Sequence, residues 1–260
     1  MKKLLLHIPH SSTYIPSNEG YVADEYKIQN EILKLTDWYT DDLFNSEKDI
    51  NIITPFSRIF CDVERFENDE EEVMAKVGMG VLYERCDNGE VLREVTPAIR
   101  ETVKQNYYRK HHAEFSTAVQ KQLQEEGSAL IIDCHSFPST PLQCAINQTK
   151  NTPDFNIGVD PFHTSSELTE IAIEYFRKLG YSWGLDWPYS GTIVPMEYYK
   201  KNNKVQSIML EVNRRLYLDE PTANKSTNYD KAKEVVLEFL DVIRNYHHNI
   251  NNSPNKIICG

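Results

Sequence analysis

The sequence has few cysteines and lacks the closely spaced pairs that bind structural zinc or form redox motifs. Of its 260 residues, five are cysteines, and they are scattered along the chain: Cys61, Cys86, Cys134, Cys144 and Cys259. A disulfide framework is typical of short secreted chains with paired cysteines. We therefore expect reduced, mostly buried thiols in a cytoplasmic protein.

Long apolar runs and an excess of positive charge are also missing. No stretch approaches the roughly 20 apolar residues that span a bilayer. The apolar run at residues 4–6 is soon interrupted by His7, Pro9 and His10, so a buried strand is predicted rather than a signal peptide. Lysine and arginine number 28 against 39 acidic residues, a net charge of −11. Such a surface repels phosphates and anionic lipids, so neither nucleic acid nor a membrane is an expected partner.

The remaining composition is that of an ordinary globular protein. Hydrophobic residues make up 40% of the chain and charged residues 26%. The length suits one domain of the α/β class. We predict a single catalytic domain over residues 1–248 and a polar tail over residues 249–260. The oligomeric state stays open.

Apolar spacing and turn residues predict alternating strands and helices. Strands are predicted at 3–8, 49–53, 58–63, 128–134 and 205–212. Helices are predicted at 23–44 (as two short helices), at 96–126 (one long helix or a broken pair) ended by Gly127, at 166–179 ended by Gly180, and at 229–246. Residues 67–88 are acidic and predict a long surface excursion. This alternation is typical of an α/β fold with a central mixed, mainly parallel sheet flanked by helices. Ligands then bind at the carboxyl ends of the strands.

Several predicted strands end in polar residues that suit metal chemistry. LLLHIPHSS (4–12) leads to His10, LIIDCHS (130–136) to Asp133 and His135, and SIMLEVNRR (207–215) to Glu211. FSRIFCDVERF (56–66) is a weaker case, with Asp62. Two histidines and a carboxylate at one rim match a catalytic zinc site. Zinc lowers the pKa of its water toward about 7, and a nearby carboxylate can take the proton.

Each of these residues also has a purely structural interpretation. A lone histidine at a strand end is more often a hydrogen-bonded structural residue, and Asp133 could simply cap a turn. His111 and His112 are expected to face solvent on a long helix. The other histidines are expected to be structural or unremarkable: His163, His247 and His248. The shared strand-end context favours His10 and His135 as ligands.

Seven segments, in order along residues 4–220, resemble the N-formylglutamate amidohydrolase family. They are PHSS (9–12), TDWYTDDLF (36–44), SRIFCDVERF (57–66), IIDCHS (131–136), PDFNIG (153–158), WPYSGTIVP (187–195) and LEVNRRLYLDE (210–220). That family is related to the zinc carboxypeptidases and to aspartoacylase-like deacylases. The resemblance implies a zinc-carboxypeptidase-like (phosphorylase/hydrolase-like) fold with Zn²⁺ at the strand ends.

The resemblance also implies roles for the polar residues. His10 and His135 are expected to bind zinc, and Glu211 to act as the general base. The HxxE signature of the carboxypeptidases is absent, because Thr13 lies three residues after His10. We therefore predict Asp62 as the third metal ligand.

The substrate is expected to be a small anion held by arginines. Arg65 and Arg214 are the predicted carboxylate anchors, with Arg58 as a further candidate. Gly191 and Thr192 are expected in a loop that closes over the substrate. Glu64 occupies a position where the family usually has asparagine, and its charge opposes an anion pocket.

Three functions are compatible with these features. The first is hydrolysis of the N-formyl or N-acyl amide of a small anionic amino-acid derivative such as N-formylglutamate. The second is a carboxypeptidase or another N-acyl-amino-acid deacylase on the same scaffold. The third is a binding protein without catalysis, against which His10, His135 and Glu211 argue.

Overall fold

A six-stranded sheet organises the computed structural model, which describes residues 1–250. The strand order is β2-β1-β3-β6-β4-β5. The strands are β1 (Leu5–Ile8), β2 (Ile50–Ile53), β3 (Ala129–Phe137), β4 (Phe155–Gly158), β5 (Trp183–Leu185) and β6 (Val205–Asn213). All neighbours pair in parallel except β4 and β6, which are antiparallel. The predicted mixed, mainly parallel sheet is confirmed. A separate small hairpin pairs β7 (Leu218–Asp219) with β8 (Asn224–Lys225).

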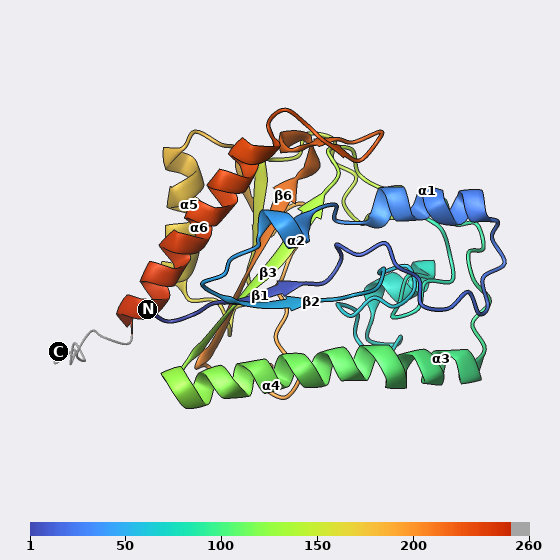
Figure 1. The fold of residues 1–260 in the computed structure, drawn as a ribbon, viewed down its shortest axis with the longest axis horizontal. Coiled ribbons are helices and arrows are strands. Elements are labelled where there is room, and N and C mark those ends of the chain that lie inside the picture. Colours follow the sequence, from blue (N-terminus) through green and yellow to red (C-terminus); the bar gives the residue numbers. More distant parts are fainter. Residues whose placement is uncertain (251–260) are drawn as a thin grey trace.

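Helices cover both faces of this sheet (Figure 1). They are α1 (Glu25–Leu35), α2 (Thr40–Leu43), α3 (Pro97–Val103), α4 (Arg109–Glu126), α5 (Ser166–Lys178) and α6 (Tyr229–Ile250). A π-helical turn at Lys104–Tyr108 joins α3 to α4, and short 3-10 turns lie at Val73–Val77 and Arg214–Leu216. α5 and α6 pack together on one face, whereas α4 lies against the other.

The alternation of side chains along each strand decides what meets each helix layer. Leu6 and Ile132 pack in the cluster formed with α5 and α6, whereas Leu5 and Ile131 pack with Phe115 of α4. Full burial of such a side chain contributes about 1.5–3 kcal/mol. These two apolar layers therefore fix which residues of β1, β3 and β6 point toward α4.

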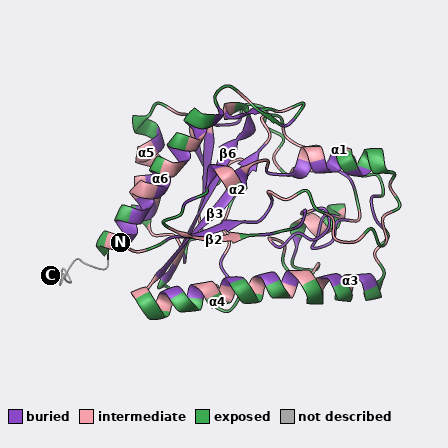
Figure 2. Cartoon of the chain, viewed as in Figure 1, coloured by how far each residue is buried: buried purple, intermediate pink, exposed green. Residues whose placement is uncertain are grey.

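Local signals account for the ends of the main helices. The side chains of Asp24, Thr96 and Ser165 accept backbone hydrogen bonds at the starts of α1, α3 and α5. α4 ends at Gly127, whose φ of 75° is accessible to glycine at little cost. The strands are buried throughout most of their length, and the helices expose only their outer sides (Figure 2).

The structure differs from the predicted elements in several places. Residues 58–63 form no strand, because the N–H groups of Phe60 and Cys61 bond the carbonyl of Ser57 in a buried turn. β4, β5 and the hairpin strands β7 and β8 were not predicted. α6 continues to Ile250, beyond the predicted start of the polar tail, and residues 251–260 with Cys259 lie outside the described part. Within residues 1–250, no helix combines the length and apolarity that crossing a bilayer requires.

Candidate metal and catalytic site

Polar side chains replace the apolar layer on the α4 side of the sheet, near the carboxyl ends of β1, β3 and β6. Strand register brings them together: His7 lies opposite Asp133, and His135 lies opposite Glu211. Asp133 and His135 are two residues apart on β3, so they share one face. All four are buried. The site is therefore part of the sheet itself and not only of the loops that follow it.

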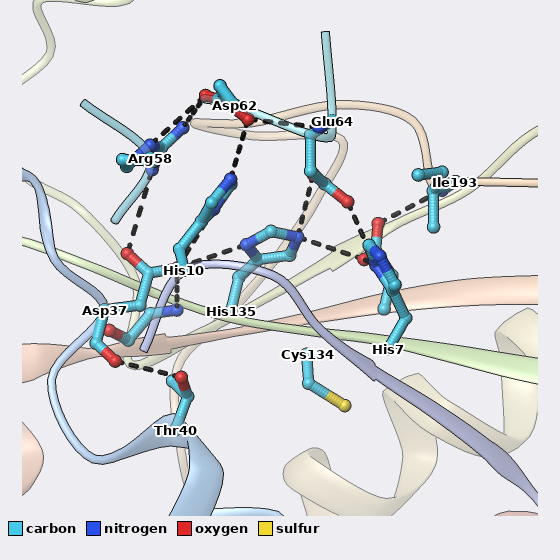
Figure 3. A network of polar contacts seen from close by, with 12 residues as sticks. His7, His10, Asp37, Thr40, Arg58, Asp62, Glu64, Cys134, His135 and Ile193 are labelled. Atoms are coloured by element: carbon cyan, nitrogen blue, oxygen red, sulfur yellow. Dashed lines mark hydrogen bonds and ion pairs between the residues drawn. The ribbon is translucent and has the colours of Figure 1, made fainter. Parts of the chain in front are cut away.

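His10, Asp37 and His135 form the first candidate metal-binding group (Figure 3). One nitrogen or oxygen atom of each lies within 4.8 Å of the other two. Asp37 Oδ2 is 3.1 Å from His135 Nδ1 and 3.7 Å from His10 Nδ1. Asp37 is brought to the site by the turn between α1 and α2, and its N–H donates to the carbonyl of His10. Tyr39, with φ of 61°, then reverses the chain into α2.

The Asp37 carboxylate is held ionised in this buried position. Arg214 Nη2 donates to Asp37 Oδ1 at 3.0 Å, and the N–H of Ser136 donates to Oδ2 at 3.3 Å. Burial alone would raise the pKa of Asp37, but the imidazoles of His10 and His135 and the Arg214 guanidinium hold it well below its usual range. Arg214 also donates to the carbonyl of Lys34, so its guanidinium is committed to the protein.

Asp62, the predicted third ligand, instead lies among arginines. Its Oδ1 is 2.8 Å from His10 Nε2, the nitrogen on the far side of the ring from Asp37. Its Oδ2 pairs with Arg58 at 3.0 Å and Arg65 at 3.3 Å and accepts from the Tyr83 hydroxyl at 2.7 Å. Although burial opposes ionisation, these cations hold the pKa of Asp62 well below its usual range. Asp62 belongs to neither candidate metal group.

A second group comprises His7, Glu64 and Asp133. His7 Nδ1 lies 3.2 Å from Glu64 Oε1 and 3.1 Å from Asp133 Oδ1. His135 adjoins this group through Nε2, which is 3.0 Å from both Glu64 Oε2 and Asp133 Oδ1. Figure 3 shows His135 between the two groups, with Glu64 on one side and His10 on the other.

Glu211 lies beside His135 with a carboxylate oxygen that has no hydrogen-bond partner. The residue is 6% exposed, and Oε2 is the unpartnered atom. Burial raises the pKa of Glu211 to about 8, against the opposing effect of His135. A carboxylate with a pKa near the working pH can both take and return a proton.

The predicted loop residues line a cavity that adjoins the second group. This cavity of about 930 Å³ lies between α4, the loop at 190–199 and residues 63–71, and it reaches Glu64 and Asp133. Gly191, Thr192 and Arg65 line it, whereas Arg58 and Arg214 do not. Arg58 is half-buried against Asp62.

The prediction that His111 faces solvent is wrong, because the ring is buried against β1. His111 Nε2 lies 2.9 Å from His7 Nε2, and burial holds the pKa of His111 well below its usual range. His112 is half-buried, with Nε2 2.9 Å from the carbonyl of Val63. His163 is buried between the backbone groups of Val205 and Lys200, as expected of a structural residue. His247 and His248 belong to α6.

Asp37 is a candidate site residue that sequence reasoning missed. It lies in the TDWYTDDLF segment, which resembles the family, but no strand precedes it. Its place in that segment was the only signal that the sequence offered.

The first group fits a divalent cation. His10 Nδ1 is buried and has no hydrogen-bond partner, although it faces Asp37 Oδ2. Two imidazoles with one carboxylate are a common donor set for catalytic zinc. Arg214 and Ser136 orient the carboxylate in the way that hydrogen bonds to metal ligands usually do.

Solved structures share this fold at low sequence identity. N-formylglutamate amidohydrolase from Ralstonia eutropha JMP134 has a TM-score of 0.81 and 20% identity, covering 96% of both chains. A gene product from Agrobacterium tumefaciens has a TM-score of 0.65 and 14% identity, covering 96% of this chain and 92% of the other. Comparison with the sequences of curated proteins gives no match.

The sequence itself also matches a family model. The model for N-formylglutamate amidohydrolase covers residues 2–218, which include both candidate metal groups and Glu211. The family resemblance stated from the sequence motifs is thereby confirmed. The chain belongs to the N-formylglutamate amidohydrolase family, hydrolases that act on carbon–nitrogen amide bonds.

Proposed function

We propose that the protein is a zinc-dependent amidohydrolase that removes the N-formyl or another N-acyl group from a small anionic amino-acid derivative. One observation carries this proposal: a buried histidine–aspartate–histidine group lies beside a buried glutamate. His10 Nδ1 and Glu211 Oε2 both lack hydrogen-bond partners. The first suits a metal ligand and the second a proton acceptor.

His10, Asp37 and His135 would hold the ion, with Asp37 in place of the Asp62 predicted from the sequence. When bound, zinc supplies a Lewis acid that polarises the scissile carbonyl and lowers the pKa of a nearby water. Asp62 would act indirectly, by fixing His10 through Nε2. A carboxylate on the second ring nitrogen orients a ligand histidine and fixes its tautomer.

Glu211 would transfer the proton. It accepts a proton from the attacking water as the new C–O bond forms at the acyl carbon. It then delivers this proton to the amide nitrogen as the C–N bond breaks, which yields a carboxylic acid and a free amine. β6 holds Glu211 in register with His135 and so prevents drift from the reacting atoms.

Arg58 and Arg65 are the arginines available to a substrate carboxylate. Their side chains are 17% and 20% exposed, whereas that of Arg214 is 6% exposed and bound to Asp37. Asp62 neutralises only one of the two half-exposed positive charges. A substrate carboxylate that takes the place of part of the Asp62 contact would be bound by the planar guanidinium group of an arginine, through two hydrogen bonds.

Glu64 favours a second candidate, an N-acyl-amino-acid deacylase or carboxypeptidase with a different leaving group. Its carboxylate lies within the site and lines the adjoining cavity. A negative charge there disfavours the second carboxylate of a glutamate-type substrate. The solved relative named N-formylglutamate amidohydrolase supports the first candidate through its fold.

A hydrolysis screen tests both candidates. Zinc-loaded protein is offered N-formyl, N-acetyl and N-succinyl derivatives of glutamate, aspartate and neutral amino acids, and amine release is measured. Glu211→Gln is the inactive comparison, and Glu47→Gln, on the exposed surface, is the matched control. Turnover of N-formylglutamate supports the first candidate, and turnover of other acyl amino acids alone supports the second. No turnover of any member by zinc-loaded protein contradicts both.

We also propose a cytoplasmic location. Four cysteines are free in the described part of the chain: Cys61, Cys86, Cys134 and Cys144. Reduced thiols are typical of cytoplasmic proteins.

A further inference from the structure

We propose that His7, Glu64 and Asp133 form a second divalent-cation site, which shares His135 with the site assigned above. It extends the proposed function from one ion to two, and it rests on that function only through His135. The donor atoms are His7 Nδ1, Glu64 Oε1 or Oε2, Asp133 Oδ1 and His135 Nε2.

The spacing of these atoms matches donors that surround one ion. The four closest distances are 3.2 Å for His7–Glu64, 3.1 Å for His7–Asp133, and 3.0 Å for His135 to each carboxylate. Zinc binds nitrogen and oxygen at about 2.0–2.2 Å, so tetrahedral ligands lie about 3.4 Å from one another. A small inward-facing ring of donors is already assembled.

Neighbouring groups hold two of the donors, His7 and Asp133, in this orientation. The far nitrogen of His7 lies 2.9 Å from His111 Nε2, and the His7 ring stacks on Phe115 with centroids 4.7 Å apart. The N–H of Ile193 donates to Asp133 Oδ2 at 3.1 Å, which leaves Oδ1 facing the histidines. Hydrogen bonds behind the ligands are typical of metal sites. The contact with His7 also accounts for the burial of the His111 ring.

The cluster has a route to solvent. His7 is 0% exposed and Asp133 is 1% exposed, whereas the Glu64 side chain is 16% exposed. Glu64 and Asp133 line the cavity of about 930 Å³ next to α4. An ion can therefore enter past Glu64, the donor that lies nearest the opening, and a site of this kind needs such an entry path.

The mixture of two carboxylates with imidazole nitrogen defines the class of ion. Such donors suit divalent ions from Mn²⁺ to Zn²⁺ and provide no thiolate for softer ones. The His135 ring faces Asp37 through Nδ1 and this cluster through Nε2. To ligate both ions, His135 would give up its remaining ring proton and bind as an imidazolate.

A competing explanation is a cluster of ion pairs between protonated histidines and carboxylates. Metal stoichiometry separates the two. Metal-free, full-length protein is dialysed against excess Zn²⁺ and, in a second arm, Mn²⁺, and bound metal per chain is measured by elemental analysis. The variants are Glu64→Gln and Asp37→Asn. The control is Glu71→Gln, an exposed residue that lines the same cavity outside the cluster.

Wild type and Glu71→Gln are expected to bind two ions, and Glu64→Gln and Asp37→Asn one each. Asp133→Asn should reproduce the loss seen in Glu64→Gln, which guards against a folding defect in either variant. If wild type binds only one ion and both Glu64→Gln and Asp133→Asn retain it, the second site is overturned. If wild type binds only one ion, which Glu64→Gln loses and Asp37→Asn keeps, the result supports the site at His7, Glu64 and Asp133. It also overturns the ligand set of the proposed function.

Discussion

Replacing Glu211 with glutamine is predicted to abolish turnover and, at the same time, to stabilise the metal-free protein. Glu211 is 6% exposed, one of its carboxylate oxygens has no partner, and burial raises its pKa from 4.5 to about 8. Glutamine has nearly the same shape and carries no charge that must be desolvated. Residues that serve catalysis often cost stability in this way.

The magnitude follows from the shift in pKa. Below pH 4.5 the carboxyl group is protonated in both the folded and the unfolded protein, so the shift costs nothing. Between pH 4.5 and about 8 the unfolded chain releases the proton that the folded protein keeps, so stability falls as the pH rises. At pH 7 the penalty reaches about 3 kcal/mol, since one pKa unit corresponds to about 1.4 kcal/mol. Above pH 8 it is constant.

Urea unfolding of metal-free wild type and Glu211→Gln at several pH values from 4 to 9 measures this penalty. The difference in the free energy of unfolding should grow from near zero at pH 4 to a plateau above pH 8. Glu47→Gln should follow wild type. In the loaded enzyme, removal of the base should lower kcat by about 10²–10⁴-fold with metal content unchanged.

Two results would refute the reasoning separately. Parallel stability curves for wild type and Glu211→Gln would show that burial imposes no charge penalty on this carboxylate. Wild-type turnover by Glu211→Gln would show that another group takes the proton, whatever the stability curves do.

Three further predictions concern the metal and the substrate. Loss of a residue that only supports a metal ligand typically weakens metal binding by about 10–100-fold. A competitive chelator titration should show a larger loss of zinc affinity for His10→Ala and Asp37→Asn, and a loss within that range for Asp62→Asn. Equal losses of affinity in Asp37→Asn and Asp62→Asn would contradict the assignment of Asp37. Chelation should remove activity and added Zn²⁺ should restore it, so full activity after verified metal removal would exclude a metal-dependent reaction. Wild type should have a higher kcat/KM for a substrate carboxylic acid than for the corresponding amide, and Arg65→Lys should lose most of this preference. Equal kcat/KM values for acid and amide in wild type would rule out the anion pocket.

The parts of the fold that sequence could predict are those with strong apolar patterns. β3 and β6 are buried almost throughout, and their continuous apolar runs have few alternative interpretations. β4 and β5 have four and three residues, too few for periodicity to separate them from loops. Residues 58–63 are nearly as buried but form a turn, because burial alone does not determine whether backbone groups bond within a turn or to a neighbouring strand.

The candidate site was predictable where polar residues interrupt or end those strands. His10, His135 and Glu211 were chosen in this way, and the structure brings His135 and Glu211 into register. Asp37 reaches the site through a backbone contact with His10 that no local pattern encodes. His7 was treated as a break in an apolar run, although its place on the α4 face of β1 brings it opposite Asp133.

The charges gathered at the site determine how a bound metal would change its net charge. Five carboxylates and three guanidinium groups lie buried or half-buried around His135: Asp37, Asp62, Glu64, Asp133 and Glu211, with Arg58, Arg65 and Arg214. Histidines that bind a metal are neutral, so with Glu211 ionised two negative charges remain for the metal to compensate, and buried charges without partners are strongly unfavourable. One divalent cation would make the site neutral, and a second, with His135 as the bridging imidazolate, would leave it with one positive charge. A protein with a net charge of −11 could then attract an anionic substrate to this one place. Bound metal, more than the arginines, would therefore decide whether the pocket accepts an anion.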